Sequence, residues 1–361
     1  MKRLLVLILS LFVAACGCDR KSAETAREQL MHRLSSSAED GRILYGHQDD
    51  LVYGHSWVVS DVDGDALARS DIRDVAGRYP AVVGFDLGGI EMGDRCNLDS
   101  VPFDLIRKAA LTHISRGGVV TFSWHPRNPL TSGDAWDISS DEVVYEILPD
   151  GGLHDRFMVW LDHLAGFLES LDGAPVIFRP WHENLGSWFW WGWSLCSATE
   201  YKALYQLTHD YLVQERGLTN LIWCYSPNGP VSEADYLSRY PGDAYVDMMG
   251  TDIYEYVGED GMEAAGARFQ AQVREMLSTL RRLAPEHGKL WCLSETGLEG
   301  LVDPHWWTEV QYPAITDSGI CYVLTWRNAH DRPGHFYAPW NGFDGEGDFK
   351  VFSEKDDILF L

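Results

Sequence analysis

The 361-residue chain has an ordinary globular composition and a strongly acidic charge. Its 45% hydrophobic and 23% charged residues exclude an intrinsically disordered chain and a membrane protein with many spanning helices. The 54 acidic against 29 basic residues give a formal charge of −25, which repels phosphate backbones and argues against nucleic acid as a partner. The length fits one large domain, because a single α/β barrel takes roughly 250 to over 400 residues.

The first residues have the pattern of an export signal. Lys2 and Arg3 precede an apolar run that is too short for a stable membrane span, and two alanines follow it. Residues 1–15 are therefore predicted to be a signal peptide. The letters VAAC that end at Cys16 resemble the lipobox of bacterial lipoproteins, in which the cysteine carries the lipid. We expect an exported protein that Cys16 anchors to a bacterial membrane, in the periplasm or at the cell surface; the alternative is an ordinary signal peptide followed by a chance cysteine.

The polar segment over 16–38 is predicted to be a tether that leads into a first helix. After it, one pattern repeats to the end of the chain. A β-branched or apolar run ends in polar or aromatic residues, and a helical stretch follows. Eight units of this kind favour a closed (β/α)8 TIM barrel over residues 39–361, with an open doubly wound sheet as the alternative. The eight runs are Arg42–Gly46, Ala81–Leu87, Gly118–Ser123, Pro175–Arg179, Leu221–Tyr225, Val246–Thr251, Lys289–Ser294 and Ile320–Thr325.

Three long helices are predicted between these runs. Asp155–Leu171 and Met262–Leu283 carry apolar residues at helical spacing, which is typical of packing against a core. Ala198–Arg216 follows Ser197, and Glu200 stands three residues after that serine, which is the spacing of a capping box.

Two glutamates occupy the strand ends where a barrel of this kind places its active site. Glu183 follows the fourth predicted strand, and Glu295 closes the seventh. Strands four and seven face each other across the barrel mouth, so the two carboxyl groups are expected to converge. Glycoside hydrolysis with retention needs such a pair about 5–5.5 Å apart. Mutual repulsion would raise the pKa of one of them and supply the acid without a metal.

Aromatic residues gather next to the first glutamate, in the run Trp188–Trp193. Such a cluster beside an acid fits stacking on sugar rings, and core packing is the alternative. The zinc-protease pattern H-E-x-x-H is absent because Gly186 stands where its second histidine would be, and no G-x-S-x-G motif is present. No cysteine or histidine spacing suggests a metal, so no metal or cofactor is predicted.

Five motifs in chain order resemble glycoside hydrolase family 26, which secreted bacterial β-mannanases typify. The resemblance runs from about residue 43 to residue 340 and predicts the same barrel fold. The motifs are Gly46-His47-Gln48, Trp124-His125-Pro126, Arg179-Pro180-Trp181-His182-Glu183-Asn184 with Trp188, Ser294-Glu295-Thr296-Gly297 and Leu324-Thr325-Trp326-Arg327-Asn328.

The resemblance implies a retaining double displacement in which Glu183 is the acid/base and Glu295 is the nucleophile. It implies that His182 hydrogen-bonds the nucleophile or the sugar, that His125 contacts the sugar at the cleavage subsite, and that Tyr254 supports the nucleophile.

For the remaining substrate contacts, the resemblance implies that Trp188 stacks on the leaving-group side and that Trp326 forms the floor under the sugar that is attacked. Arg327 would hold hydroxyl groups one subsite further on, and Trp136 is a candidate for another stacking platform.

The predicted function is endo-type hydrolysis of β-1,4 bonds in mannan, glucomannan or galactomannan. Three alternatives stay open: end-acting release of mannobiose, the β-1,3-xylanase or mixed-linkage glucanase activity found in the same family, and a lipid-anchored glycan-binding protein without turnover. The acidic surface suits a neutral polysaccharide as the partner.

Overall fold

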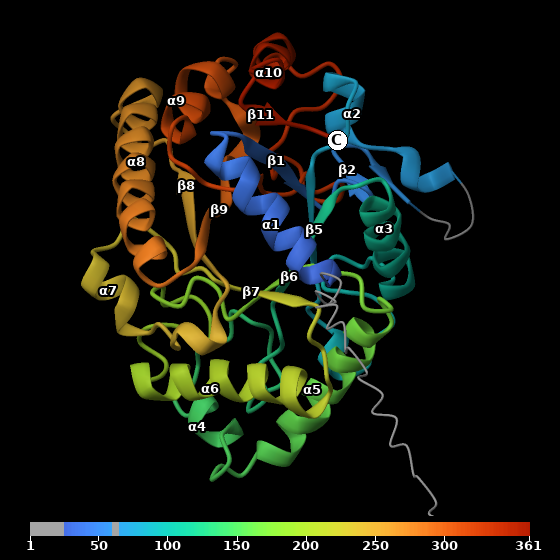
Figure 1. The fold of residues 1–361 in the computed structure, drawn as a ribbon, viewed down its shortest axis with the longest axis vertical. Helices are drawn as coiled ribbons and strands as arrows, with labels where there is room; N and C mark the ends of the chain where they lie inside the picture. Colours follow the sequence, from blue (N-terminus) through green and yellow to red (C-terminus); the bar gives the residue numbers. More distant parts are fainter. Residues whose placement is uncertain (1–24, 60–64) are drawn as a thin grey trace, which may run out of the picture.

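A closed barrel of eight parallel strands forms the centre of the protein (Figure 1). The computed structural model describes residues 25–59 and 65–361. Each barrel strand pairs with the next one in chain order, and the last pairs with the first, which confirms the predicted (β/α)8 barrel and excludes an open sheet. The strands are β1 (Ile43–Gln48), β4 (Val82–Asp86), β5 (Val119–Trp124), β6 (Val176–Pro180), β7 (Leu221–Tyr225), β8 (Met248–Glu255), β9 (Leu290–Leu298) and β10 (Tyr322–Thr325).

Two of these strands extend by four residues beyond their predicted ends. β8 and β9 continue past the expected ends at Thr251 and Ser294, because they pair with each other up to Glu255 and Leu298. A register shift at Asp252 accompanies this extension. Glu295 therefore lies inside a strand rather than at its end, which gives its backbone a fixed position.

Helices surround the barrel, as Figure 1 shows for α3 on one side and α8 on the other. Each of the three predicted long helices overlaps an α-helix of the structure. Predicted Ala198–Arg216 is shortened, because the backbone widens into a π-helical turn over Tyr211–Glu215. The α-helices are α1 (Ala26–Glu39), α2 (Asp71–Ala76), α3 (Phe103–Ser115), α4 (Val143–Ile147), α5 (His154–Glu169), α6 (Ala198–Asp210), α7 (Glu233–Ser238), α8 (Met262–Glu286), α9 (Tyr312–Ile315) and α10 (Glu346–Ser353).

The capping box that begins α6 is present in the structure. The Ser197 hydroxyl accepts a hydrogen bond from the backbone N–H of Glu200, and the Glu200 carboxylate accepts one from the backbone N–H of Ser197. Such caps stabilise a helix by about 1 kcal/mol. They fix where α6 starts, directly after the aromatic run 188–193.

Helix α1 lies across the amino-terminal end of the barrel (Figure 1). Its Leu30 and Leu34 are buried against inward-facing residues such as Leu44 and Ile222. The helix expected after the tether is therefore α1, and the packed domain includes residues from Ala26 on rather than from residue 39. The two leucines close the bottom of the barrel by removing apolar surface from water.

Three very short strands were not predicted. β2 (Tyr53–Gly54) and β3 (Trp57–Val58) form a small hairpin after β1. β11 (Ile358–Leu359), close to the end of the chain, pairs in parallel with the start of β1, on the edge opposite to β10.

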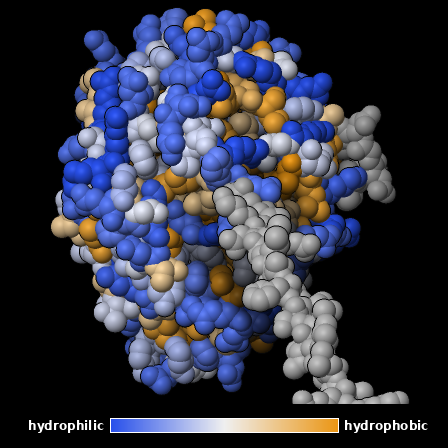
Figure 2. All heavy atoms as spheres, viewed as in Figure 1, coloured by the Kyte–Doolittle hydropathy of each residue, from blue (hydrophilic) through white to orange (hydrophobic). Residues whose placement is uncertain are grey.

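The predicted signal peptide and Cys16 lie outside the described residues. Within 25–59 and 65–361, no helix has the length and apolar character needed to cross a membrane. Figure 2, which has the same view as Figure 1, shows a mostly hydrophilic surface with small apolar areas between charged side chains.

Candidate active site

A cleft of about 320 Å³ opens at the carboxyl ends of the barrel strands. Phe189, a member of the predicted aromatic run, lines it, and so do Tyr256 and Tyr337, which were not predicted. Tyr256 directly follows β8, so its position at the carboxyl end of a strand is a signal that the sequence carries. The structure brings both candidate carboxylates and most of the predicted contacts into this one site. The predicted residues that line it are His125, Trp136, His182, Glu183, Trp188, Tyr254, Glu295 and Trp326.

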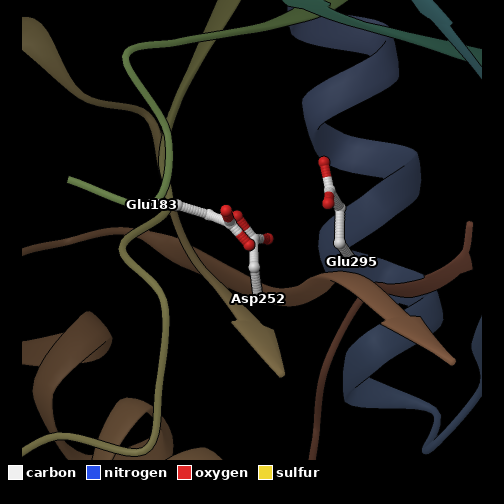
Figure 3. Close-up of side chains that lie close together, drawn as sticks. All are labelled: Glu183, Asp252 and Glu295. Atoms are coloured by element: carbon white, nitrogen blue, oxygen red, sulfur yellow. The ribbon is translucent and has the colours of Figure 1, made fainter. Parts of the chain in front are cut away.

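Three carboxyl groups meet in this cleft. One oxygen each of Glu183, Asp252 and Glu295 lies within 4.8 Å of the other two. Figure 3 shows that Glu183 comes from a loop and that Asp252 and Glu295 come from neighbouring strands. Carboxylates at this separation cannot all carry a full negative charge without a nearby cation or a shared proton.

Arg179, on β6, supplies the nearest positive charge. Its guanidinium donates to Glu295 Oε1 through Nη2, and to Asp252 Oδ2 at 3.0 Å through Nη1. The side chain is 2% exposed, and pairing with two carboxylates compensates for the cost of burying a guanidinium. Arg179 therefore holds the negative charge of Glu295 in a fixed place.

Asp252 is held in place by three neighbouring side chains. Besides Arg179, the hydroxyl of Ser294 donates to Asp252 Oδ1 at 2.7 Å, and that of Ser226 donates to Oδ2 at 3.3 Å. Burial, opposed by Arg179 and reinforced by Glu295, raises the pKa of Asp252 to about 8. The three acids thus carry less than three negative charges at neutral pH.

Glu295 receives its second hydrogen bond from a tyrosine. The hydroxyl of Tyr254 on β8 donates to Glu295 Oε2 at 2.8 Å, while Arg179 occupies Oε1. The Nε2 atom of His182 faces His125 rather than the nucleophile, so the predicted contact of His182 with the sugar stays a prediction. Both oxygens of Glu295 are therefore held by groups on strands.

Glu183 stands on a tight turn after β6. Its φ of 53° and that of Trp181, 56°, lie in the left-handed region, which is costly for residues with a side chain and is common at functional sites. Its backbone N–H donates to the carbonyl of Ser226 at 2.8 Å, which fixes the turn.

The surroundings of Glu183 favour its protonated form. Burial, with the charges of Glu295 and Asp252 adding to it, raises the pKa of Glu183 well above its usual range. The indole N–H of Trp188 donates to Glu183 Oε2 at 2.7 Å, which stabilises the anion and lowers that pKa again in part. A carboxylic acid that stays protonated near neutral pH is what general acid catalysis requires.

The aromatic run 188–193 divides between the core and the surface. Trp190 and Trp191 are fully buried and Phe189 is nearly so. Trp188 and Trp193 are 41% and 54% exposed, so they are free to stack on a ligand. Packing therefore accounts for Phe189, Trp190 and Trp191, and sugar stacking stays a prediction for the two exposed tryptophans.

Two histidines lie edge to face beside Glu183. His125 Nε2 and His182 Nε2 are 3.0 Å apart, and the opposite nitrogen of His125, Nδ1, is 2.6 Å from Asp86 Oδ2. Burial, together with the charge of Arg179, lowers the pKa of His182 well below its usual range, so that ring is neutral. The ring of His125 also stacks on Trp136, with centroids 5.3 Å apart.

Arg327 is the one predicted contact that does not line this cleft. Its guanidinium forms an ion pair with Asp99 at 2.7 Å and donates to the hydroxyl of Tyr53 at 3.1 Å. It directly follows Trp326, which does line the cleft, so it stands beside the site with its orientation fixed by two partners.

A second cavity, of about 510 Å³, adjoins the cleft. It shares His125 and Trp136 with the cleft and is otherwise lined by the loops after β4 and β5, including Asn97 and Arg127. The two spaces together give the site an extended shape, which suits a chain of several sugar units.

Three charged residues that organise the site were not predicted: Arg179, Asp252 and Asp86. Each ends or interrupts an apolar strand, and a charge in such a place needs a partner. That signal was available in the sequence, but the sequence does not tell which charges from distant strands would meet.

Comparisons with known proteins agree with this geometry. The family model described as glycosyl hydrolase family 26 matches residues 19–293. A mannan endo-1,4-β-mannosidase of Bifidobacterium adolescentis is 32% identical over 374 residues; the match covers 96% of this chain and 37% of that protein. This chain thus spans little more than a third of the length of that relative.

Solved structures extend the comparison to the whole barrel. A family 26 β-mannanase from Bacteroides ovatus is 40% identical, with a TM-score of 0.86, over 93% of this chain and 95% of that one. The catalytic domain of an endo-β-1,4-mannanase from Bacillus sp. JAMB-750 is 32% identical, with a TM-score of 0.81, over 94% and 93%. With a family model that covers most of its residues and relatives that share its whole fold, the chain belongs to glycosyl hydrolase family 26.

Proposed function

We propose that this protein is a retaining endo-β-1,4-mannanase that hydrolyses mannan, glucomannan or galactomannan. The observation that supports it most directly is the carboxyl pair, because oxygens of Glu183 and Glu295 lie within 4.8 Å. Retaining glycosidases hold their two carboxyl groups about 5–5.5 Å apart, whereas inverting enzymes need about 6.5–9.5 Å to admit a water molecule. The close pair therefore supports a double displacement.

In the first step, an Oε atom of Glu295 forms a bond to the anomeric carbon while the bond from that carbon to the leaving sugar breaks. Glu183 gives its proton to the leaving oxygen, so the departing group is a neutral hydroxyl. In the second step, Glu183 takes a proton from water, the water oxygen attacks the anomeric carbon, and Glu295 leaves as a carboxylate. Arg179 and Tyr254 hold the charge of that carboxylate at both of its oxygens.

The substrate assignment is supported by the relatives and by the character of the site. The similar proteins from Bifidobacterium adolescentis and Bacteroides ovatus are named for β-mannan cleavage. Exposed tryptophans at the cleft, Trp136 and Trp188, offer flat faces for sugar rings. The formal charge of −25 favours a neutral polymer over a polyuronate.

The test is hydrolysis of mannohexaose, β-1,3-xylan and mixed-linkage glucan by the purified protein, with products separated by size over time. An endo-mannanase gives a spread of manno-oligosaccharides from the start. Mannobiose as the only early product would indicate end-acting release, and cleavage of only the xylan or the glucan would make the mannan assignment wrong. Binding of mannohexaose without cleavage would favour the non-catalytic glycan-binding alternative.

Replacing Trp188 with phenylalanine is expected to move the alkaline limb of the pH profile for kcat/KM to higher pH. Glu183 must be protonated for the first step, so activity falls as the pH rises through its pKa. The Trp188 N–H stabilises the Glu183 anion, and its loss therefore raises that pKa. KM is expected to rise about 2- to 10-fold with the smaller ring.

The matched control for this prediction is Trp193→Phe, because Trp193 is exposed in the same loop. It should leave the alkaline limb in place. A shift of the limb to lower pH in the Trp188 variant, or an equal shift in both variants, would contradict the role of this hydrogen bond.

We also propose that Cys16 carries a lipid that anchors the protein to a bacterial membrane, as the residues before it suggest. Expression in a bacterium that processes lipoproteins should give a protein that incorporates radioactive palmitate and partitions into detergent. Cys16→Ala should lose both properties and keep its hydrolytic activity, whereas the control Cys18→Ala should lose neither. Retention of label in the Cys16 variant would refute the anchor.

A further inference from the structure

Asp86 is a buried carboxylate that lies behind His125 and faces three hydrogen-bond donors. It ends β4 and is 2% exposed. Its Oδ1 accepts the backbone N–H of Gly88 at 2.7 Å. Its Oδ2 accepts the hydroxyl of Ser123 at 2.7 Å and faces His125 Nδ1 at 2.6 Å. A carboxylate can only accept, so His125 must carry a proton on Nδ1.

The proton on Nδ1 determines the rest of the chain of hydrogen bonds. A neutral His125 with its proton on Nδ1 has a bare Nε2, which then accepts from His182 Nε2 at 3.0 Å. His182 is neutral and so keeps a bare Nδ1, an atom that is buried and has no hydrogen-bond partner among the described residues.

The opposite direction would be costly. If His125 donated from Nε2, the neutral His182 would have to carry its proton on Nδ1. A buried N–H without an acceptor loses its hydrogen bond to water, and such orphaned N–H groups are rarer in proteins than under-satisfied acceptors. All bonds are therefore satisfied when the direction runs from His182 through His125 to Asp86.

We propose that Asp86 is a positioning residue for catalysis, which sets the tautomers of His125 and His182 and thereby the orientation of both rings beside Glu183. Both rings line the cleft, and His182 immediately precedes Glu183 in the chain. The inference rests on the proposed function in one respect only, namely that these rings face the sugar that is cleaved. Asp86 itself is not among the residues that line the cleft.

Replacing Asp86 with asparagine is expected to reverse the chain of hydrogen bonds. The backbone N–H of Gly88 needs an acceptor, so the amide oxygen takes the Oδ1 position and the NH2 group takes the Oδ2 position. The NH2 group then donates to His125 Nδ1, and the His125 proton moves to Nε2. His182 must in turn accept at Nε2 and place its own proton on the buried Nδ1.

The direct test is NMR of protein labelled with ¹⁵N-histidine, with the signals assigned from His125→Gln and His182→Gln. In the wild type, His125 should be protonated on Nδ1 and His182 on Nε2, and Asp86→Asn should invert both. The opposite tautomers in the wild type would overturn the proposal, and that spectrum decides even if the variant does not fold.

The kinetic test uses whichever β-glycan the wild type cleaves fastest, so that a wrong polymer assignment does not affect it. Asp86→Asn should lower kcat about 100-fold, because a small misplacement of the reacting groups slows a reaction by about that factor. KM should change by less than about 3-fold. Inverted tautomers with an unchanged kcat would refute the positioning role and leave the proposed function intact.

The matched control is Ser123→Ala, which removes a hydrogen bond to the same Asp86 oxygen but keeps the carboxylate. It should retain the wild-type tautomers and a kcat close to that of the wild type. An equal loss of kcat in this variant without inversion of the tautomers would show that Asp86 matters only for packing, which would also refute the proposal.

Discussion

Replacing Glu295 with alanine is expected to lower kcat on mannohexaose by at least about 10⁴-fold, or about 5.5 kcal/mol of barrier. The reason is that the covalent intermediate forms on this carboxylate, which Arg179 and Tyr254 hold at both oxygens. Asp252 does not replace it, because Ser294, Ser226 and Arg179 already occupy its oxygens.

The measurement uses an aryl β-mannobioside with and without sodium azide. Azide fits the space that the missing carboxylate leaves and attacks from the same face, so Glu295→Ala should regain activity and release the α-glycosyl azide. The exposed Glu354 provides the control, and Glu354→Ala should behave as the wild type. Release of the β-azide by the Glu295 variant would contradict its assignment as nucleophile.

Replacing Glu183 with alanine should produce a different pattern, which depends on the leaving group. On polysaccharide the loss should be about 10³-fold, because general acid–base catalysis contributes about 10²–10⁴-fold. A 2,4-dinitrophenyl group leaves without a proton, so the first step on that substrate should stay within about 10-fold of the wild type. The second step still lacks its base.

Stopped-flow measurement of dinitrophenolate release should therefore show a fast burst followed by slow turnover in Glu183→Ala. Azide should accelerate the slow phase and give the β-glycosyl azide, since it attacks the intermediate from the face that water uses. Equal losses on both substrates, with no burst, would contradict the acid/base assignment. The burst also requires an intact Glu295, because the covalent intermediate forms on it. The Glu295 and Glu183 variants therefore test the nucleophile and the acid/base separately.

Much of the barrel could be predicted because its strands are buried on both faces. Near-continuous apolar runs such as those before Glu183 and Glu295 are the usual signature of parallel strands, and each of the eight corresponds to a barrel strand. The position of both glutamates followed from the rule that active sites lie at the carboxyl ends of these strands.

Polar partnerships could not be predicted in the same way. Arg179 meets Asp252 and Glu295, and Asp86 meets His125, from strands that are far apart in the sequence. Composition and periodicity place each of these residues on a strand but carry no information about which neighbour its side chain faces. The turn that places Glu183 could not be predicted from the sequence either. Its positive φ values occur at residues other than glycine, where the sequence gives no signal for them.

The short strands were missed for a different reason. A strand of two residues, as in β2, β3 and β11, is too short for any alternation to appear. β2 and β3 pair with each other, whereas β11 pairs with β1, from which it is separated by most of the chain.

The closure of the barrel also determines the order in which the protein can complete its fold. Tyr45 on β1 hydrogen-bonds Thr325 on β10, 280 residues later, and β11 is added to the same strand still later in the chain. At a synthesis rate of about 5–20 residues per second, β10 is synthesised roughly 15–60 s after β1. Until then β1 is an edge strand with one open side, and such an edge can pair with another molecule.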